Sequence, residues 1–349
     1  MNLLCVMVLA VGYAALFWWA FRTLPNEGWQ FVASVPTHRD NQGAWSGLNL
    51  TYYGLFTASA VTLSVGGVII LLGATAQPLA AIAWLVATLL ALTMPAARVI
   101  ARIVEGKNNT FTIAGASFVG LLAAPWLILL LNATLGSRLG FALPLFESLG
   151  ALAIAYAFGE GTGRLACMSF GCCYGKPLPR GMTWWTKLLG ARYVAFSGET
   201  KKVAYEAGLE RVPLVPIQAM TAMFDVGAGL LGLTLFLGGR APAAFLVTTL
   251  FTQLWRVGAE MLRADYRGRG AISAYQIMAA VACLYAMTLF ILLPVDWKGA
   301  VNIFAGVQVL WHPGVIVWLQ AVWGVTFLYT GCSRVTAARI SFLVLRDQI

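Results

Sequence analysis

The chain has 349 residues, of which 60% are hydrophobic and only 10% are charged. Soluble globular domains carry about 25% charged residues, so this composition excludes an ordinary soluble domain. Several apolar runs reach the roughly 20 residues that an α-helix needs to cross the hydrocarbon core, and they lack the alternation of a barrel strand. The sequence therefore predicts an all-α, polytopic membrane protein.

The formal net charge is +10, from 23 Lys and Arg against 13 Asp and Glu. The basic residues fall in expected interhelical loops rather than in one compact basic domain, which argues against a nucleic-acid partner. Anionic phospholipid headgroups are the simpler partner for a basic membrane protein.

Hydropathy predicts about nine spans, each judged by its length and its polar flanks. They lie near residues 2–21, 49–74, 77–97, 112–134, 144–162, 214–237, 242–264, 272–294 and 308–332. The first has no basic segment before it and no clear cleavage site, so we interpret it as a retained transmembrane helix. The span at 144–162 contains Glu147 and Glu160, which indicates that it faces protein rather than lipid.

Two polar stretches, residues 22–47 and 176–213, are expected outside the membrane. The second mixes aromatic residues with basic ones, a composition suited to the interfacial layer, and predicts a small extramembrane cap. Its basic residues are Arg180, Lys187, Arg192, Lys201, Lys202 and Arg211. The arginines that follow Cys332 favour a cytoplasmic C-terminus.

The cysteines predict neither a disulfide framework nor a metal site. They are Cys5, Cys167, Cys172, Cys173, Cys283 and Cys332. The group at 167–173 has no companion ligand pair, and His38 and His312 lie far from it in the sequence. We expect no metal and no cofactor. Buried neutral thiols are usually inert, so small-residue packing is favoured over a covalent nucleophile.

Ionisable groups within membrane spans cost several kcal/mol unless they are paired or hydrated, so they are candidates for function. Glu160 and Arg164 stand four residues apart and share one face of a helix, while the glycines around them permit close backbone approach. A structural ion pair at a helix end is the alternative interpretation. Such pairs also occur in membrane proteins without a substrate.

A second polar stripe is formed by Arg256, Glu260 and Arg263, which share one face of a predicted helix. A solvated helix end explains Arg263 but not Arg256, which lies one to two turns deeper, so we interpret Arg256 as functional. Arg98 and Arg102 follow a span, and snorkelling to the interface explains them. Two arginines in a low-dielectric site complement a phosphate diester, to which a guanidinium donates two parallel hydrogen bonds.

Six short segments carry motifs in a fixed order along the chain. They are LTYYGL at 50–55, AAR at 96–98, GASFVG at 115–120, GRLACMSFGCCYGKP at 163–177, VPIQ at 215–218 and RVGAEMLR at 256–263. This ordered set resembles the prolipoprotein diacylglyceryl transferase family. The corresponding family elements include Trp-Tyr-Gly-Leu, Gly-Gly-Arg, Gly-Met-Ser-Phe-His-Gly, His-Pro-Ser-Gln and Arg-x3-Glu-x2-Arg. No single segment is specific for the family, but the occurrence of all six in the family's order is.

The resemblance covers roughly residues 49–293. It implies a seven-helix body with a periplasmic head after its fourth helix, in the bacterial inner membrane with the site toward the periplasmic leaflet. Residues 1–48 would then add an N-terminal helix and a loop, residues 49–295 would form the body with its head at 176–213, and residues 296–349 would add a C-terminal helix and a basic tail. The activity implied is transfer of diacylglyceryl from phosphatidylglycerol to a lipoprotein cysteine.

The chain departs from the family at positions that concern the acceptor. Val119 stands where the family has its functionally implicated histidine, Cys167 replaces an Asn, Cys172 replaces a Glu, and Met220 and Thr221 replace a Tyr-Glu pair. A thiol with a pKa near 8.5 must lose its proton before it attacks carbon, and valine cannot take that proton. Either Glu160 or Glu260 acts as the base, or the acceptor is a different one.

We therefore expect a transferase that uses phosphatidylglycerol or a similar anionic phospholipid, with an unidentified acceptor. The catalytic candidates are Arg164, Arg256 and Glu260: the arginines would stabilise charge on the departing phosphate, and Glu260 would orient Arg256 and Arg263. The substrate-binding candidates are Arg98, Tyr53, Glu160, Arg263 and Gln218. Two alternatives stay open, a non-catalytic phospholipid-binding or scaffold protein and a transporter of an anionic solute.

Overall fold

The computed structural model describes residues 1–106, 112–178, 193–266, 272–295, 297 and 299–349. Within these residues, seven helices are long and apolar enough to cross a membrane, so the chain is an α-helical membrane protein. They are α1 (Asn2–Thr23), α2 (Tyr52–Ala74), α3 (Leu79–Glu105), α4 (Ile113–Leu131, continuing to Leu139), α9 (Ile217–Leu237), α11 (Ala274–Leu292) and α13 (Pro313–Gly331).

Two further helices are as long but more polar. α6 (Leu145–Phe170) has 26 residues and α10 (Ala241–Leu262) has 22, and they carry the charged groups singled out in the sequence. All nine expected spans coincide with a long helix, while a crossing by α6 and α10 stays a prediction. Shorter helices are α5 (Ser137–Leu139), α8 (Lys202–Ala207) and α12 (Ile303–Leu310).

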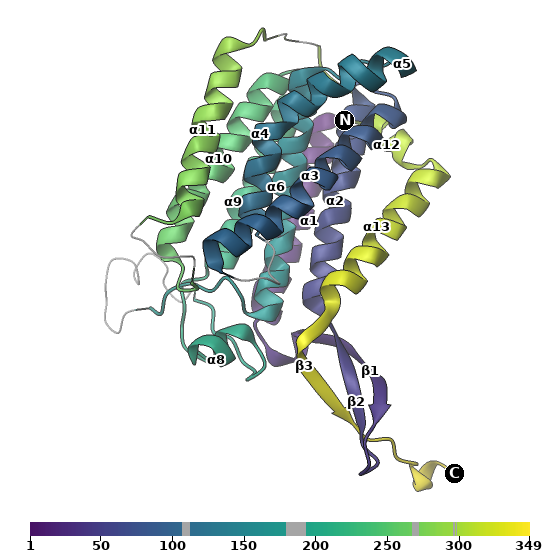
Figure 1. The fold of residues 1–349 in the computed structure, drawn as a ribbon, viewed down its shortest axis with the longest axis vertical. Helices are drawn as coiled ribbons and strands as arrows, with labels where there is room; N and C mark the ends of the chain where they lie inside the picture. Colours follow the sequence, from purple (N-terminus) through teal and green to yellow (C-terminus); the bar gives the residue numbers. More distant parts are fainter. Residues whose placement is uncertain (107–111, 179–192, 267–271, 296, 298) are drawn as a thin grey trace.

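The all-α prediction is wrong for one part of the chain, a three-stranded antiparallel sheet in the order β1-β2-β3. Its strands are β1 (Phe31–Arg39), β2 (Trp45–Thr51) and β3 (Cys332–Ile340). β1 and the first part of β2 lie in the polar stretch expected as a loop, the last residues of β2 lie at the start of the expected span 49–74, and β3 lies in the basic tail. The sheet projects from one end of the bundle, the end at which α8 lies (Figure 1).

The sheet sets where α2 begins. The span expected from residue 49 starts instead at Tyr52, because residues up to Thr51 pair with β1 and β3. Thr51 then caps α2, its side chain accepting a hydrogen bond from the backbone N–H of Gly54. A capping threonine satisfies a backbone donor that the first turn of a helix leaves without a partner.

α6 lies inside the bundle, where it packs on α2, α9 and α10 (Figure 1). Glu147 and Glu160 on this helix are both buried, as the interpretation of this span as protein-facing requires. Large apolar side chains are exposed on the outer helices instead, among them Ile277, Leu284 and Ile291 on α11. Such contiguous apolar surface is typical of a lipid-facing wall.

The expected cap at 176–213 is described only in part, because residues 179–192 lie outside the described residues together with Arg180, Lys187 and Arg192. Its remaining part packs on the ends of α1 and α6 through Val194, Phe196 and Val203, together with Leu214 directly after the cap, all buried. Short β-bridges join Leu214 to residues 177 and 194.

Lys201 connects this cap to the helix bundle by hydrogen bonds. Its side chain is fully buried, and Nζ donates hydrogen bonds to the carbonyl oxygens of Leu24, 3.1 Å away, and Ser169, 2.6 Å away. Burial disfavours the charged amine and lowers the pKa of Lys201 from 10.5 to about 8. A neutral amine still has two hydrogens, enough for both carbonyls.

This burial predicts how stability depends on pH. Between about pH 8 and pH 10.5 the unfolded chain keeps the Lys201 amine protonated while the folded protein loses the proton, so stability rises with pH by up to about 3 kcal/mol. Lys201→Met should flatten this rise, measured as the thermal unfolding midpoint in detergent from pH 7.5 to 10. Lys202→Met, which removes the neighbouring lysine whose side chain is 25% exposed, is the control and should leave the rise in place. An equal slope in wild type and Lys201→Met would contradict this assignment.

Candidate functional site

Two glycines bring α6 into close contact with its neighbours beside the charged residues. A Cβ on Gly159 would lie 1.9 Å from Oγ of Ser64 on α2, and a Cβ on Gly161 would lie 2.7 Å from a side-chain carbon of Val226 on α9. Both distances are too short for a real Cβ, so any other residue at these positions would have to displace the side chains of Ser64 and Val226. The glycines thus allow α6 to approach α2 and α9 closely on either side of Glu160, as expected from the sequence.

Glu160 is the centre of the site. Its side chain is only 1% exposed, and its Oε1 accepts hydrogen bonds from Nη2 of Arg164, on the same helix, and from Nη2 of Arg256 on α10, 3.4 Å away. The two arginine side chains are 15% and 11% exposed. The structure therefore brings both predicted catalytic arginines to one point, about two turns before the ends of α6 and α10.

Two members of this cluster were not anticipated. Tyr156, one turn before Glu160, accepts a hydrogen bond from Nη2 of Arg256 and interacts with Ser117 on α4. Asp225 on α9 is 3% exposed and interacts electrostatically with Glu160, Arg164 and Arg256. A lone aspartate within an apolar span is the same signal that identified Glu160, and it was available in the sequence.

Glu260 contacts partners other than the predicted Arg256. Its carboxylate lies 3.9 Å from Arg263 and 3.5 Å from the hydroxyl of Ser273, which donates to it. Arg263 also donates two hydrogen bonds, of 2.8 and 2.7 Å, to the carboxylate of Asp265. Arg256 contacts Glu160 and Tyr156 instead. The predicted grouping of Glu260 with Arg263 is therefore present, while Arg256 is oriented by residues of α6.

The loop after α6 is fixed against the end of α10. The backbone N–H of Lys176 donates to the carbonyl of Leu262, and that of Ala264 donates to the carbonyl of Tyr174. Gln218 on α9, 1% exposed, donates its side-chain amide to the carbonyl of Cys172 at 2.9 Å. Gln218 therefore positions the cysteine loop.

The other two predicted substrate-binding residues lie on α2 and α3. Tyr53 packs edge-on against Phe170 with ring centroids 5.5 Å apart, and it interacts electrostatically with Arg164 and the three neighbouring cysteines. Arg98 donates a hydrogen bond to the hydroxyl of Tyr329 on α13 and lies 5.7 Å from that ring. Tyr53 thus borders the site, and Arg98 contacts α13.

The balance of charge decides what the cluster can do. Glu160, Arg164, Asp225 and Arg256 together offer two carboxyls to two guanidiniums, which is the pairing that buried charges need. In the described part of the chain, however, Glu160 Oε2 and Arg164 Nε are buried without a hydrogen-bond partner. Unpaired donors and acceptors of this kind are costly, and a polar ligand would satisfy them.

The sequence matches no protein-family model and no curated protein sequence.

The cluster predicts a large effect of one substitution on stability. Glu160→Gln removes the carboxylate that both arginines contact and leaves two buried cations, so it should lower the free energy of unfolding by about 3–5 kcal/mol. The control is Arg211→Gln, which removes one charge of the Arg211–Glu210 pair, whose side chains are 82% and 31% exposed. That change should cost less than about 1 kcal/mol.

Both variants can be compared by thermal unfolding in detergent and by retention on size-exclusion chromatography. Equal, small effects would mean that the ion pairs around Glu160 are hydrated and do not hold the helices together.

Proposed function

We propose that this protein binds the headgroup of phosphatidylglycerol or a similar anionic phospholipid at the Arg164–Arg256 cluster and transfers its diacylglyceryl part to an acceptor. The observation that carries the proposal is the convergence of both arginines on a single oxygen, Oε1 of Glu160. Two guanidiniums that meet at one carboxylate oxygen are also spaced to meet at one phosphate oxygen. The resemblance to the diacylglyceryl transferases supports the same choice of ligand.

The depth of the site suits a lipid rather than a free solute. Arg164 and Arg256 lie about two turns inside helices that end at the cap, so a headgroup would reach them from the adjacent leaflet while its acyl chains stay among the apolar helices. The resemblance supports the bacterial inner membrane, with this end toward the periplasm. Because β3 and the C-terminus lie at the same end as α8 (Figure 1), this orientation replaces the cytoplasmic C-terminus that the arginines after Cys332 favoured.

The reaction we propose is a displacement at carbon. A nucleophilic atom of the acceptor forms a bond to the terminal glyceryl carbon of the diacylglyceryl group, and the bond from that carbon to the phosphate oxygen breaks. The electron pair leaves on the phosphate oxygen, so glycerol phosphate departs with added negative charge. Arg164 and Arg256 would stabilise that charge as it develops.

The acceptor must also lose a proton, and Val119 cannot accept it. Glu160 is the better placed of the two carboxylates considered as base, because its Oε2 has no hydrogen-bond partner within the described residues whereas Glu260 contacts Arg263 and Ser273. Glu160 would then hold the arginines with one oxygen and take the proton with the other.

A second function is favoured by a specific observation. The cluster of Glu160, Asp225 and the two arginines is already paired without a ligand, as a structural site would be. Together with Val119, this supports a protein that keeps a lipid site without the chemistry, a binding or scaffold protein.

Loss of either arginine should weaken donor binding. Each would contribute charge-assisted bonds of roughly 1.5–3 kcal/mol, so Arg164→Ala or Arg256→Ala should reduce affinity for phosphatidylglycerol by about tenfold to a hundredfold. Lysine should rescue poorly, since it keeps the charge but loses the planar donor set. The two losses should be non-additive because both residues bind one group. Native mass spectrometry in mixed micelles would measure this binding.

Arg22→Ala is the matched control, because Arg22 lies over the ring of Trp18 on α1 and outside the cluster. It should bind lipid as wild type does. Folded, monodisperse Arg164 and Arg256 variants with unchanged affinity would remove the arginines from any lipid site.

Turnover separates the transferase from the scaffold. Lipid extracts of cells with and without the gene should differ by a diacylglyceryl-linked product, and cells that carry Glu160→Gln should lack it even where the purified variant retains lipid. A protein that co-purifies with phosphatidylglycerol while the product profile stays unchanged would be the scaffold.

A further inference from the structure

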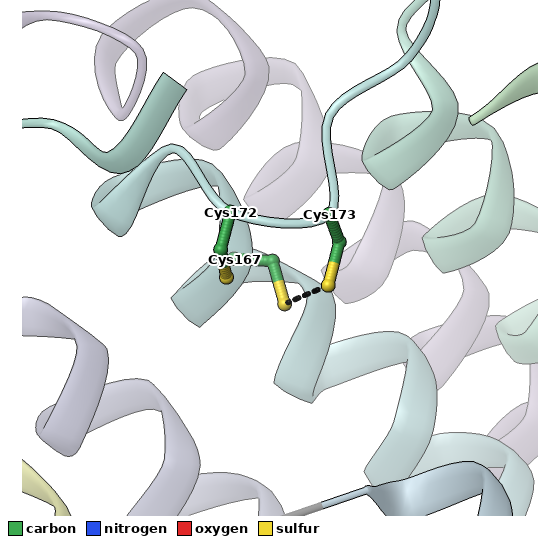
Figure 2. A group of neighbouring side chains, drawn as sticks. All are labelled: Cys167, Cys172 and Cys173. Carbon is green, nitrogen blue, oxygen red and sulfur yellow. Dashed lines mark hydrogen bonds between the residues drawn. The ribbon is translucent and has the colours of Figure 1, made fainter. Parts of the chain in front are cut away.

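Three cysteine sulfurs meet at the end of α6. The Sγ atoms of Cys167, Cys172 and Cys173 all lie within 4.8 Å of one another, and those of Cys167 and Cys173 are 3.8 Å apart. Cys167 is on the helix, and the other two are on the loop that follows it, with their side chains turned back toward Cys167 (Figure 2). None of the three forms a disulfide.

The backbone holds this arrangement before any ligand binds. The helix ends at Gly171, with a φ of +73°, and the N–H groups of Gly171 and Cys172 both donate to the carbonyl of Cys167. Gln218 fixes the carbonyl of Cys172. Cys173 has a φ of +55°, which a residue with a side chain adopts only where its surroundings impose it. That conformation turns its sulfur back toward Cys167.

The spacing suits a metal ion. Zinc binds thiolate sulfur at about 2.3 Å, so two sulfurs on a tetrahedral zinc ion lie about 3.8 Å apart, and sulfurs around a trigonal copper(I) ion lie only slightly further apart. The observed separation of Cys167 and Cys173 equals the tetrahedral value. A small side-chain rotation would bring Cys172 into the same range.

The surroundings suit the charge of such a complex. Three thiolates leave a net negative charge on a zinc or copper(I) ion, and Arg164, Arg263 and Lys202 all interact electrostatically with cysteines of this group. Soft thiolate ligands select zinc and copper(I) over magnesium, calcium and manganese. Arg164 is thus shared between the cluster around Glu160 and the cysteines.

We propose that Cys167, Cys172 and Cys173 form a binding site for one thiophilic d10 cation, zinc(II) or copper(I). On binding, each thiol releases its proton to solvent as its sulfur bonds to the ion, with no change in oxidation state. The sequence spacing predicted no metal because it lacked a fourth ligand. Three ligands with an outside group in the fourth position are nevertheless a known zinc arrangement, and three alone satisfy copper(I).

The test is metal binding by the full-length protein, purified in detergent under a reductant. It would be dialysed against zinc(II) or, separately, against copper(I) under argon, and its metal content measured by plasma mass spectrometry. A chromophoric chelator in competition gives the affinity for each ion. We expect one equivalent of one of these ions, with affinity lowered at least tenfold in Cys167→Ser, Cys172→Ser and Cys173→Ser.

Cys283→Ser is the matched control, because Cys283 is a buried cysteine on α11 outside the group, and it should bind metal as wild type does. A second measurement needs no variant: bound metal should protect the three cysteines of the group, and not the others, from alkylation mapped by mass spectrometry. Absence of metal with all thiols reduced, or a Cys167–Cys173 disulfide formed in its place, would overturn the proposal.

Discussion

The central constraint on this protein is the burial of a carboxylate, Glu160, between two guanidiniums in a helix bundle without bulk water. A single carboxylate oxygen holds Arg164 and Arg256, and through them it connects α6 with α10, while Asp225 adds a contact from α9. A buried charge is tolerated only when it is paired, so these helices must meet in one register. The glycines at 159 and 161 allow that register, because a Cβ at either position would collide with the side chain of Ser64 on α2 or Val226 on α9.

Much of the fold follows from local properties of the sequence. In the part of the chain that the structure describes, nine long helices lie where hydropathy places them, and the two polar ones, α6 and α10, carry the charges that indicated a site. The sheet could not be predicted in the same way. β2 pairs with β3 from the far end of the chain, and pairing at that separation leaves no periodicity in either segment alone. β1 is exposed along nearly its whole length, so it lacks the buried apolar face that identifies a strand, and its sequence indicated a polar loop.

The charged residues of the site could be predicted from the sequence, because a charge in an apolar span is unusual. Their side-chain partners could not, because these depend on contacts between helices. Glu160, Arg164 and Arg256 meet as expected, but Arg256 contacts Glu160 and Tyr156 rather than Glu260. Which side chains of α10 reach α6 depends on how the two helices pack, and the sequence of neither helix fixes that. The cysteines show the same limit: a left-handed turn at residue 173 brings their sulfurs together. A cation held by them would offer another way to deprotonate an acceptor thiol where Val119 replaces the family histidine, because a metal-bound thiol loses its proton.

The claim that an anionic lipid headgroup reaches the buried arginines is tested most directly by locating the lipid. A phosphatidylglycerol analogue with a photoreactive group beside the phosphate would be incorporated into nanodiscs with the wild-type protein, irradiated, and mapped by peptide mass spectrometry. The structure predicts crosslinks on the segments of α6 and α10 that carry Arg164 and Arg256, reduced by competing unlabelled phosphatidylglycerol. Crosslinks confined to the exposed outer faces of α11 and α13, and insensitive to competition, would contradict it.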